Sequence, residues 1–175
     1  PKPKEFGEFI TADHVIFGEG NESRNHDTVA LVIQDSYTYW LQAYPAQHKS
    51  ADECYAAFRR FIGVGKEAGH VYSDGSEELK SSLKKLLWPH DASTPNRPAT
   101  NGLAERAVKR TKEGTSATLL QSGLDEQWWD LAMRCYCFLR NIVDELVIDT
   151  PPVALRKLEQ ENQPGQIPSA TAYKQ

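Results

Sequence analysis

Cysteine is scarce in this chain of 175 residues, and its three copies are poorly placed for covalent or metal chemistry. Cys54, Cys135 and Cys137 are too few for a disulfide framework, and no second Cys or His pair stands at zinc-site spacing around Cys135 and Cys137. These counts argue against a disulfide-stapled or zinc-finger domain. We expect the three thiols to be buried in helices.

Long apolar runs and excess positive charge are also missing. No apolar stretch approaches the length that crosses a bilayer, and residues 1–10 are charged rather than signal-like. We therefore expect a soluble intracellular protein without a secretion signal. The net charge of -4 argues against binding of nucleic acid through bulk positive charge, so such binding requires a local basic patch.

The composition that is present is that of an ordinary globular domain, with 39% apolar and 25% charged residues. It is sufficient for one substantial hydrophobic core, and the chain contains no internal repeat. Proline, glutamine and asparagine are frequent near its end. We expect a single domain over residues 1–158 and an irregular tail over residues 159–175.

Runs of β-branched and aromatic residues predict an antiparallel meander of three strands in the first part of the chain. The first strand should be interrupted at Asp13, and a tight connection at Asp35 and Ser36 should join the second strand to the third. Ser50 can cap a following helix, which should end at Gly63. The predicted strands are 8–17, 28–34 and 37–44.

The rest of the chain predicts short strands alternating with helices, and then two long helices separated by Gly123. The predicted elements are a strand at 70–73, a helix at 76–86, a brief strand at 87–91, a loop at 92–100, and helices at 101–122 and 125–143. This order indicates an α/β fold with a mixed five-stranded sheet and helices on both faces. It is the order of the ribonuclease H-like architecture.

Two acidic residues stand where a metal site could form. Asp74 follows a short buried strand, so its carboxylate would be held rigidly beside an open crevice. Glu105 lies in the first turns of a long helix, where its side chain can face the sheet. The alternative for any single acid is a solvated surface charge, because most Asp and Glu side chains are exposed.

The segments around these acids, Ser73-Asp74-Gly75-Ser76-Glu77 and 93–106, resemble the two signature segments of retroviral and retrotransposon integrase catalytic cores, which are DDE polynucleotidyl transferases. Residues 31–40 resemble the family's second and third strands, and residues 150–152 resemble the segment after its final helix. The chain departs from the family in lacking an asparagine directly after Asp74. It also has a shorter connection, of 30 residues, between Asp74 and Glu105.

The resemblance implies a catalytic triad of Asp13, Asp74 and Glu105, which would hold two Mg²⁺ or Mn²⁺ ions. Asp35 is the alternative to Asp13, since it also follows an apolar strand, although the family commonly has a structural acid there. Three carboxylates offer the hard oxygen ligands that two ions roughly 3.5 to 4 Å apart require. Such ions activate a water or DNA 3'-hydroxyl and stabilise the leaving oxygen, without a covalent enzyme intermediate.

A local basic patch follows Glu105 on the same predicted helix. Between residues 97 and 113, five basic residues outnumber two acidic ones, which gives a local charge of +3. We expect Arg106, Lys109 and Lys112 to contact DNA phosphates, and Asn101 to reach the substrate beside a flexible catalytic loop. The alternatives are an ordinary surface ion pair between Lys109 and Glu105, and a helix-capping role for Asn101.

The last predicted helix carries Trp128, Trp129, Tyr136 and Phe138, which we expect in the core, with contact between copies of the chain as the alternative. The five histidines have no paired spacing, so the amino-terminal zinc module of full-length integrases is not expected in this chain.

The leading hypothesis is a retroelement integrase core that processes DNA 3'-ends and joins them to target DNA, in the nucleus after cytoplasmic synthesis, as a homodimer or higher multimer. One alternative is a catalytically inactive or domesticated domain that binds DNA or protein. Another is a ribonuclease H-like nuclease. Metal binding separates the first alternative from the hypothesis, and strand transfer separates the second.

Overall fold

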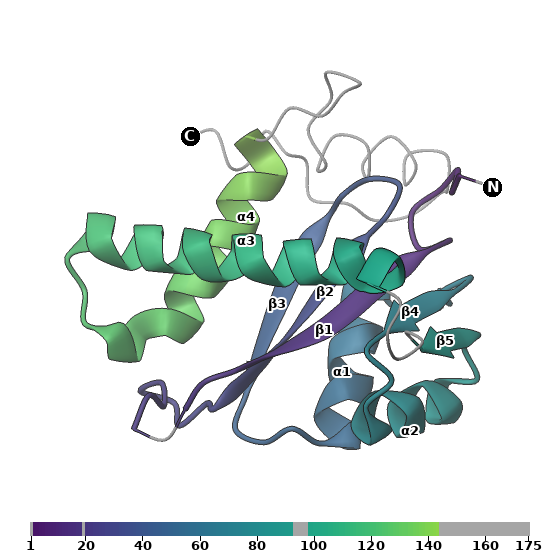
Figure 1. Cartoon of the computed structure of the whole chain (residues 1–175), viewed down its shortest axis with the longest axis horizontal. Helices are drawn as coiled ribbons and strands as arrows, with labels where there is room; N and C mark the ends of the chain where they lie inside the picture. The colour runs from purple at the N-terminus through teal and green to yellow at the C-terminus, as the bar shows by residue number, and fades with distance from the viewer. Residues whose placement is uncertain (1, 19, 93–97, 144–175) are drawn as a thin grey trace.

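The computed structural model of this protein describes residues 2–18, 20–92 and 98–143, with side chains in the last range described from Gly102 onward (Figure 1). The strands in these segments are β1 (Ile10–Ile16), β2 (Val29–Asp35), β3 (Leu41–Ala46), β4 (Val71–Ser73) and β5 (His90–Ala92). The helices are α1 (Ala51–Ile62), α2 (Glu77–Leu86), α3 (Pro98–Ser122), the short 3-10 helix η1 (Glu126–Trp128) and α4 (Trp129–Val143).

The strands form one mixed sheet in the order β3-β2-β1-β4-β5. β1, β2 and β3 are antiparallel neighbours, whereas β4 runs parallel to β1 and β5 runs parallel to β4. Parallel neighbours need a crossover connection, which α1 supplies before β4 and α2 supplies before β5. The α/β fold with a mixed five-stranded sheet, predicted from the sequence, is confirmed.

Helices cover both faces of this sheet (Figure 1). On one face, α1 and α2 pack against a core that includes Ala12 and Ile33. On the other face, α3 and α4 pack against a second core that includes Val15 and Val32. Because side chains alternate along a strand, Asp13 points to the same face as Val15, the face that α3 and α4 cover.

Local sequence signals set the ends of several helices. The hydroxyl of Ser50 accepts the N–H of Glu53 at 3.3 Å and caps α1, as predicted. Gly63 follows α1 at φ +98° and Gly123 follows α3 at φ +68°. Both angles lie in the left-handed region that favours glycine, so both predicted helix ends are confirmed.

Two predictions about the meander are wrong. β1 is not interrupted at Asp13, because that residue stays in the ladder opposite Val32. β3 begins at Leu41 rather than at residue 37, because the carboxylate of Asp35 accepts the N–H groups of Tyr37 and Thr38 and holds them in a turn. The connection is therefore longer than the pattern of apolar residues indicates.

The prediction for the start of α3 is also wrong. The helix begins at Pro98, inside the segment expected to be a loop. The fixed φ of proline suits the first turn of a helix, where the missing N–H costs nothing. Asn101 consequently lies within α3 instead of capping it, and its side chain is outside the described part of the structure.

Two expectations about burial need correction. Cys54 and Cys137 are buried, but Cys135 is exposed. Trp129 is buried and stacks on Phe17 with ring centroids 3.8 Å apart, whereas Phe138 is 43% exposed and is not part of the core. None of the described helices is long and apolar enough to cross a membrane.

Candidate functional site

Asp13 and Asp74 are placed side by side by the pairing of two parallel strands. Ala12 pairs with Ser73 in the β1–β4 ladder, and each of the two acids directly follows one of these residues. Neighbouring strands lie about 4.8 Å apart. The sheet therefore brings together two acids that belong to distant parts of the chain.

Glu105 approaches the same region from α3. This helix packs against β1, β2 and β4. Ala104 and Ala107, on either side of Glu105 in the sequence, are both buried, and Ala107 packs in the core on the sheet, while Glu105 is exposed. Glu105 thus lies at the rim of the interface between α3 and the sheet.

The ionisation of Asp13 is influenced by burial and by the charges of the other two acids. Burial raises the pKa of Asp13 to about 6, and the charges of Asp74 and Glu105 raise it as well, while the N–H of His14 and the ammonium of Lys49 lower it. Among the described residues, no three His, Cys, Asp or Glu side chains are arranged closely enough to hold a metal ion. The fold places the three predicted acids in one region, but their side chains are not arranged as a set of metal ligands in this structure.

Replacement of Asp13 by asparagine is expected to stabilise the protein near neutral pH. The pKa of Asp13 is about 6 in the folded state against 3.8 ordinarily, so its stabilising contribution is complete below pH 3.8 and is lost as the pH rises through 6. One pKa unit corresponds to about 1.4 kcal/mol, and solvent screening at this half-buried position leaves an expected gain of about 1 kcal/mol. Urea unfolding of the parent and Asp13→Asn measures this gain.

The same comparison near pH 4 should show little difference, because the parent carboxyl is then largely protonated. Asp52→Asn is the control, since the side chain of Asp52 is 88% exposed. An equal gain for Asp13→Asn at both pH values would contradict the electrostatic explanation.

Asp35 is the alternative to Asp13 as the first acid of the triad. Its carboxylate is occupied by hydrogen bonds from nearby residues, mostly from backbone N–H groups. Its Oδ1 accepts the N–H of Gly7 at 2.8 Å, and its Oδ2 accepts the N–H and the hydroxyl of Thr38 at 2.6 and 2.7 Å. Burial raises its pKa, and these hydrogen bonds lower it. Asp35 is fully buried and shares the face of Ile33, opposite to the face of Asp13. These contacts favour a structural role for Asp35.

The turn after β4 fixes the backbone around Asp74. The N–H of Ser76 donates to Oδ1 of Asp74 at 3.0 Å. Gly75 adopts φ +74°, and a Cβ atom at Gly75 would lie 2.7 Å from the Cβ of Ala92 in β5. Only glycine satisfies both conditions, so the Asp74-Gly75 sequence sets the direction in which the exposed Asp74 side chain leaves the sheet.

A charged pair that local sequence patterns do not reveal lies close enough to Asp13 to influence its ionisation. The Nζ of Lys49 lies 3.7 Å from Oε2 of Glu78, and the two side chains are 29% and 33% exposed. The charge of Lys49 favours ionisation of Asp13. Lys49 precedes the cap of α1 and Glu78 lies in the first turn of α2, so only the packing of the two helices reveals the pair.

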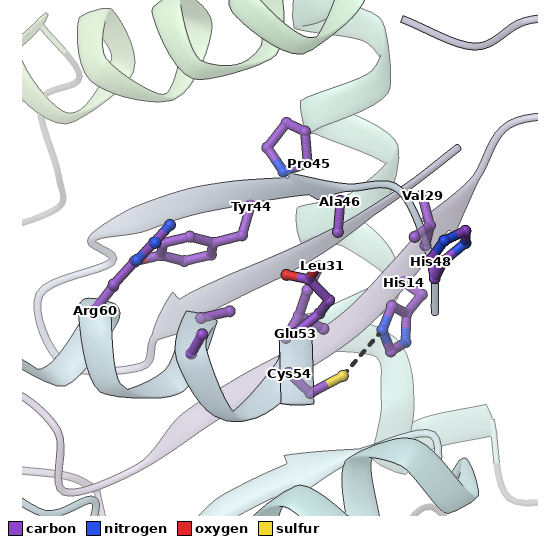
Figure 2. A pocket seen from close by; sticks show the side chains of 12 residues that line it. His14, Val29, Leu31, Tyr44, Pro45, Ala46, His48, Glu53, Cys54 and Arg60 are labelled. Carbon is purple, nitrogen blue, oxygen red and sulfur yellow. Dashed lines mark hydrogen bonds between the residues drawn. The ribbon is translucent and has the colours of Figure 1, made fainter. Parts of the chain in front are cut away.

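A second contact that the sequence did not predict joins His14 to Cys54 (Figure 2). It lies on the face of β1 opposite to the face of Asp13. His14 Nε2 lies 3.5 Å from the Sγ of Cys54, beside a cavity of about 30 Å³. Burial raises the pKa of Cys54 to about 12 and lowers that of His14 to about 4. Both shifts favour a neutral thiol and a neutral imidazole near pH 7, which argues against a thiolate nucleophile there.

The predicted DNA-contacting residues extend along the exposed side of α3. Arg106, Lys109 and Lys112 are all exposed. Lys109 Nζ lies 3.9 Å from Oε1 of Glu113, so its ion pair runs along the helix toward its C-terminus. Lys112 lines a groove of about 660 Å³ between the second half of α3, the β1–β2 connection and η1. The basic side chains therefore form a solvent-facing row that begins beside Glu105.

The donor chemistry of the three acids fits a hard divalent cation. Carboxylate oxygens are preferred by Mg²⁺ and Mn²⁺. A cation between the acids would offset both the burial of the Asp13 carboxylate, which is the main cause of its raised pKa, and the smaller repulsion from Asp74 and Glu105. Asp13 and Asp74 come from a rigid sheet, and Glu105 comes from a helix packed on that sheet.

Solved structures with the same fold include catalytic cores of retroviral integrases. The chain resembles the BIV integrase catalytic core domain with TM-score 0.63 and 15% identity, over 90% of this chain and 99% of that one. It resembles the HTLV-2 integrase catalytic core domain in complex with magnesium, in the trimeric form, with TM-score 0.65 and 14% identity, over 87% of this chain and 97% of that one.

A longer relative in structure comes from a simian T-cell lymphotropic virus intasome in complex with the PP2A regulatory subunit B56 gamma. The TM-score is 0.72 at 17% identity, and the match covers 97% of this chain. It spans 60% of the length of the viral chain. No family model and no curated protein matches the sequence. At these identities the likeness establishes the fold alone.

Proposed function

We propose that this protein is the catalytic core of a retroelement integrase, which processes DNA 3'-ends and transfers them to target DNA. The observation that carries the proposal is the placement of Asp13 and Asp74 at the ends of paired parallel strand segments, with Glu105 on the helix packed against those strands, in a fold shared with integrase cores. Their electrostatic coupling supports the triad expected from the sequence. The fold by itself is compatible with other activities.

Each residue of the triad has a definite part in this proposal. Asp13 and Asp74 would supply two carboxylate ligands from β1 and the end of β4, and Glu105 would supply the third from α3. When bound there, two Mg²⁺ or Mn²⁺ ions would activate the attacking hydroxyl and stabilise the leaving oxygen. No protein nucleophile is needed for this chemistry.

DNA would follow the basic row on α3. Arg106, Lys109 and Lys112 are exposed on the helix that carries Glu105, so phosphates bound by them would lead toward the acids. Asn101 belongs to the same helix, nearer its start. We further propose that the protein acts on nuclear DNA as a homodimer or higher multimer, as the HTLV-2 core has been solved in dimeric and trimeric forms.

A second candidate is a domain that binds DNA or protein without catalysis. It is favoured by the absence, within the described residues, of a closely assembled group of three metal-binding side chains. Such a domain would bind branched DNA but would neither cleave nor join it, with or without divalent cations. A ribonuclease H-like nuclease would cleave without joining.

The proposal is tested by disintegration and strand transfer on branched DNA in Mg²⁺ or Mn²⁺. Asp13→Asn, Asp74→Asn and Glu105→Gln should each lower the rate by roughly 100-fold or more, equivalent to about 2.7 kcal/mol of transition-state stabilisation. Each substitution removes a charged ligand while keeping the size of the side chain.

Two control variants separate the triad from other acids. Asp35→Asn, assayed at a temperature where it is folded, should retain the parent rate, and so should the exposed Asp52→Asn. Equal activity of the parent and all five variants would reject the triad. DNA binding without any turnover by the parent would favour the second candidate.

A further inference from the structure

Ser73 is a buried hydroxyl with two partners at the end of β4. Its side chain is fully inaccessible to solvent. Its Oγ lies 2.8 Å from Nε2 of His90 and accepts the N–H of Gly75 at 3.3 Å. A hydroxyl has one proton and two lone pairs, so it can serve both partners at once.

These contacts hold the chain on both sides of Asp74. Ser73 precedes Asp74 and Gly75 follows it, so the hydrogen bond between them closes a loop around the Asp74 peptide. The N–H of Ser76 then holds one oxygen of the Asp74 carboxylate. The backbone and the side chain of this acid are therefore both restrained.

His90, in β5, is the hydrogen-bond partner of Ser73 on the neighbouring strand. In the β4–β5 ladder, Val71 pairs with His90 and Ser73 pairs with Ala92, so His90 reaches Ser73 diagonally across the two strands. Loss of the imidazole would leave the buried hydroxyl of Ser73 without that partner. The hydroxyl could then turn away from Gly75.

We infer that Ser73 and His90 are positioning residues, which orient the Asp74 carboxylate for a divalent cation. The inference rests on the proposed function, because it presumes that Asp74 binds such a cation. Residues that orient a metal ligand through a hydrogen bond typically contribute about 10-fold to 100-fold in metal affinity. Neither residue touches the cation in this arrangement.

The test is a Mn²⁺ titration of the protein by calorimetry, with the binding constant as the readout. His90→Leu should raise the Kd for Mn²⁺ about 10-fold. His90→Gln should keep the Kd within about twofold of the parent, because its amide can reach Ser73 from the position of Nε2 and can donate or accept. Ser73→Ala, which removes only a hydroxyl, should weaken binding as His90→Leu does.

His70→Leu is the matched control. His70 borders the same pair of strands, but its Nε2 lies 3.2 Å from Oδ2 of Asp91 and not at Ser73. This variant should bind Mn²⁺ with the parent Kd, whatever its effect on stability. Circular dichroism at the titration temperature verifies that each variant is folded.

The outcomes distinguish this inference from the proposed function. A parent-like Kd for folded His90→Leu and Ser73→Ala, with binding abolished by Asp74→Asn, would overturn the positioning role alone. Equal weakening by His90→Gln and His90→Leu would also overturn it, because the hydrogen bond would not be the cause. Absence of saturable Mn²⁺ binding by the parent would overturn both.

Discussion

Asp35→Ala is expected to lower the free energy of unfolding by about 3 to 5 kcal/mol, because it leaves buried hydrogen-bond donors without an acceptor. The carboxylate of Asp35 accepts N–H groups from Gly7, Tyr37 and Thr38 and the hydroxyl of Thr38. It thereby joins the segment before β1 to the turn between β2 and β3. Urea unfolding of the parent and the variant measures the loss.

Asp35→Asn should cost less than Asp35→Ala. Its amide oxygen can occupy the place of Oδ2, which accepts three of the four donors, but its NH₂ group then faces the N–H of Gly7. Asp52→Ala is the exposed control; its carboxylate pairs with Lys85 at 2.7 Å on the surface, so its loss should change stability by no more than about 1 kcal/mol. A loss of Mn²⁺ binding in folded Asp35→Asn, with unchanged stability, would instead make Asp35 the first metal ligand.

Gly114→Ala is expected to lower the free energy of unfolding by about 2 to 3 kcal/mol, although alanine is the better helix former. A Cβ atom at Gly114 would lie 2.1 Å from Cε2 of Tyr136, where α3 and α4 approach each other closely. The ring would have to leave its place or the helices would have to separate. Thermal and urea unfolding measure the loss.

Gly102→Ala in the same helix provides the matched control. Within the part of the chain whose side chains the structure describes, and apart from the neighbouring turns of the helix backbone, no atom lies within 4 Å of a Cβ built at Gly102. This change should therefore stabilise the protein by about 0.5 to 1 kcal/mol. In a Tyr136→Ala background, Gly114→Ala should lose most of its cost, since the overlapping ring is absent. An undiminished cost in that background would point to a cause other than the Tyr136 contact.

Local patterns were sufficient to predict most elements of the fold. Ser50, Gly63 and Gly123 act on their own helix ends, through side-chain capping or left-handed backbone, and these predictions were confirmed. The unbroken apolar run of β2 reflects burial on both faces of the sheet. Such signals act between residues that are close in the sequence, so they can be recognised without the tertiary structure.

Two of the predictions that failed depended on contacts that the local pattern does not contain. β3 starts late because the side chain of Asp35 organises the following turn, and Phe138 is exposed because α4 packs through other residues. The ion pair of Lys49 with Glu78 likewise requires the packing of α1 beside α2. The spacing of apolar residues cannot predict such features, because it shows which residues are apolar and not which residues they contact in the fold.

The sequence by itself determined which acids were candidates, since the segments around Asp74 and Glu105 carry the resemblance to integrase cores. Only the tertiary structure decided their surroundings. Parallel pairing of β1 with β4 places Asp13 beside Asp74, and strand alternation turns Asp35 to the opposite face. The bond from Ser73 to His90 likewise arises across two strands. Motifs record the chemistry of residues, whereas strand register and packing decide which of them meet.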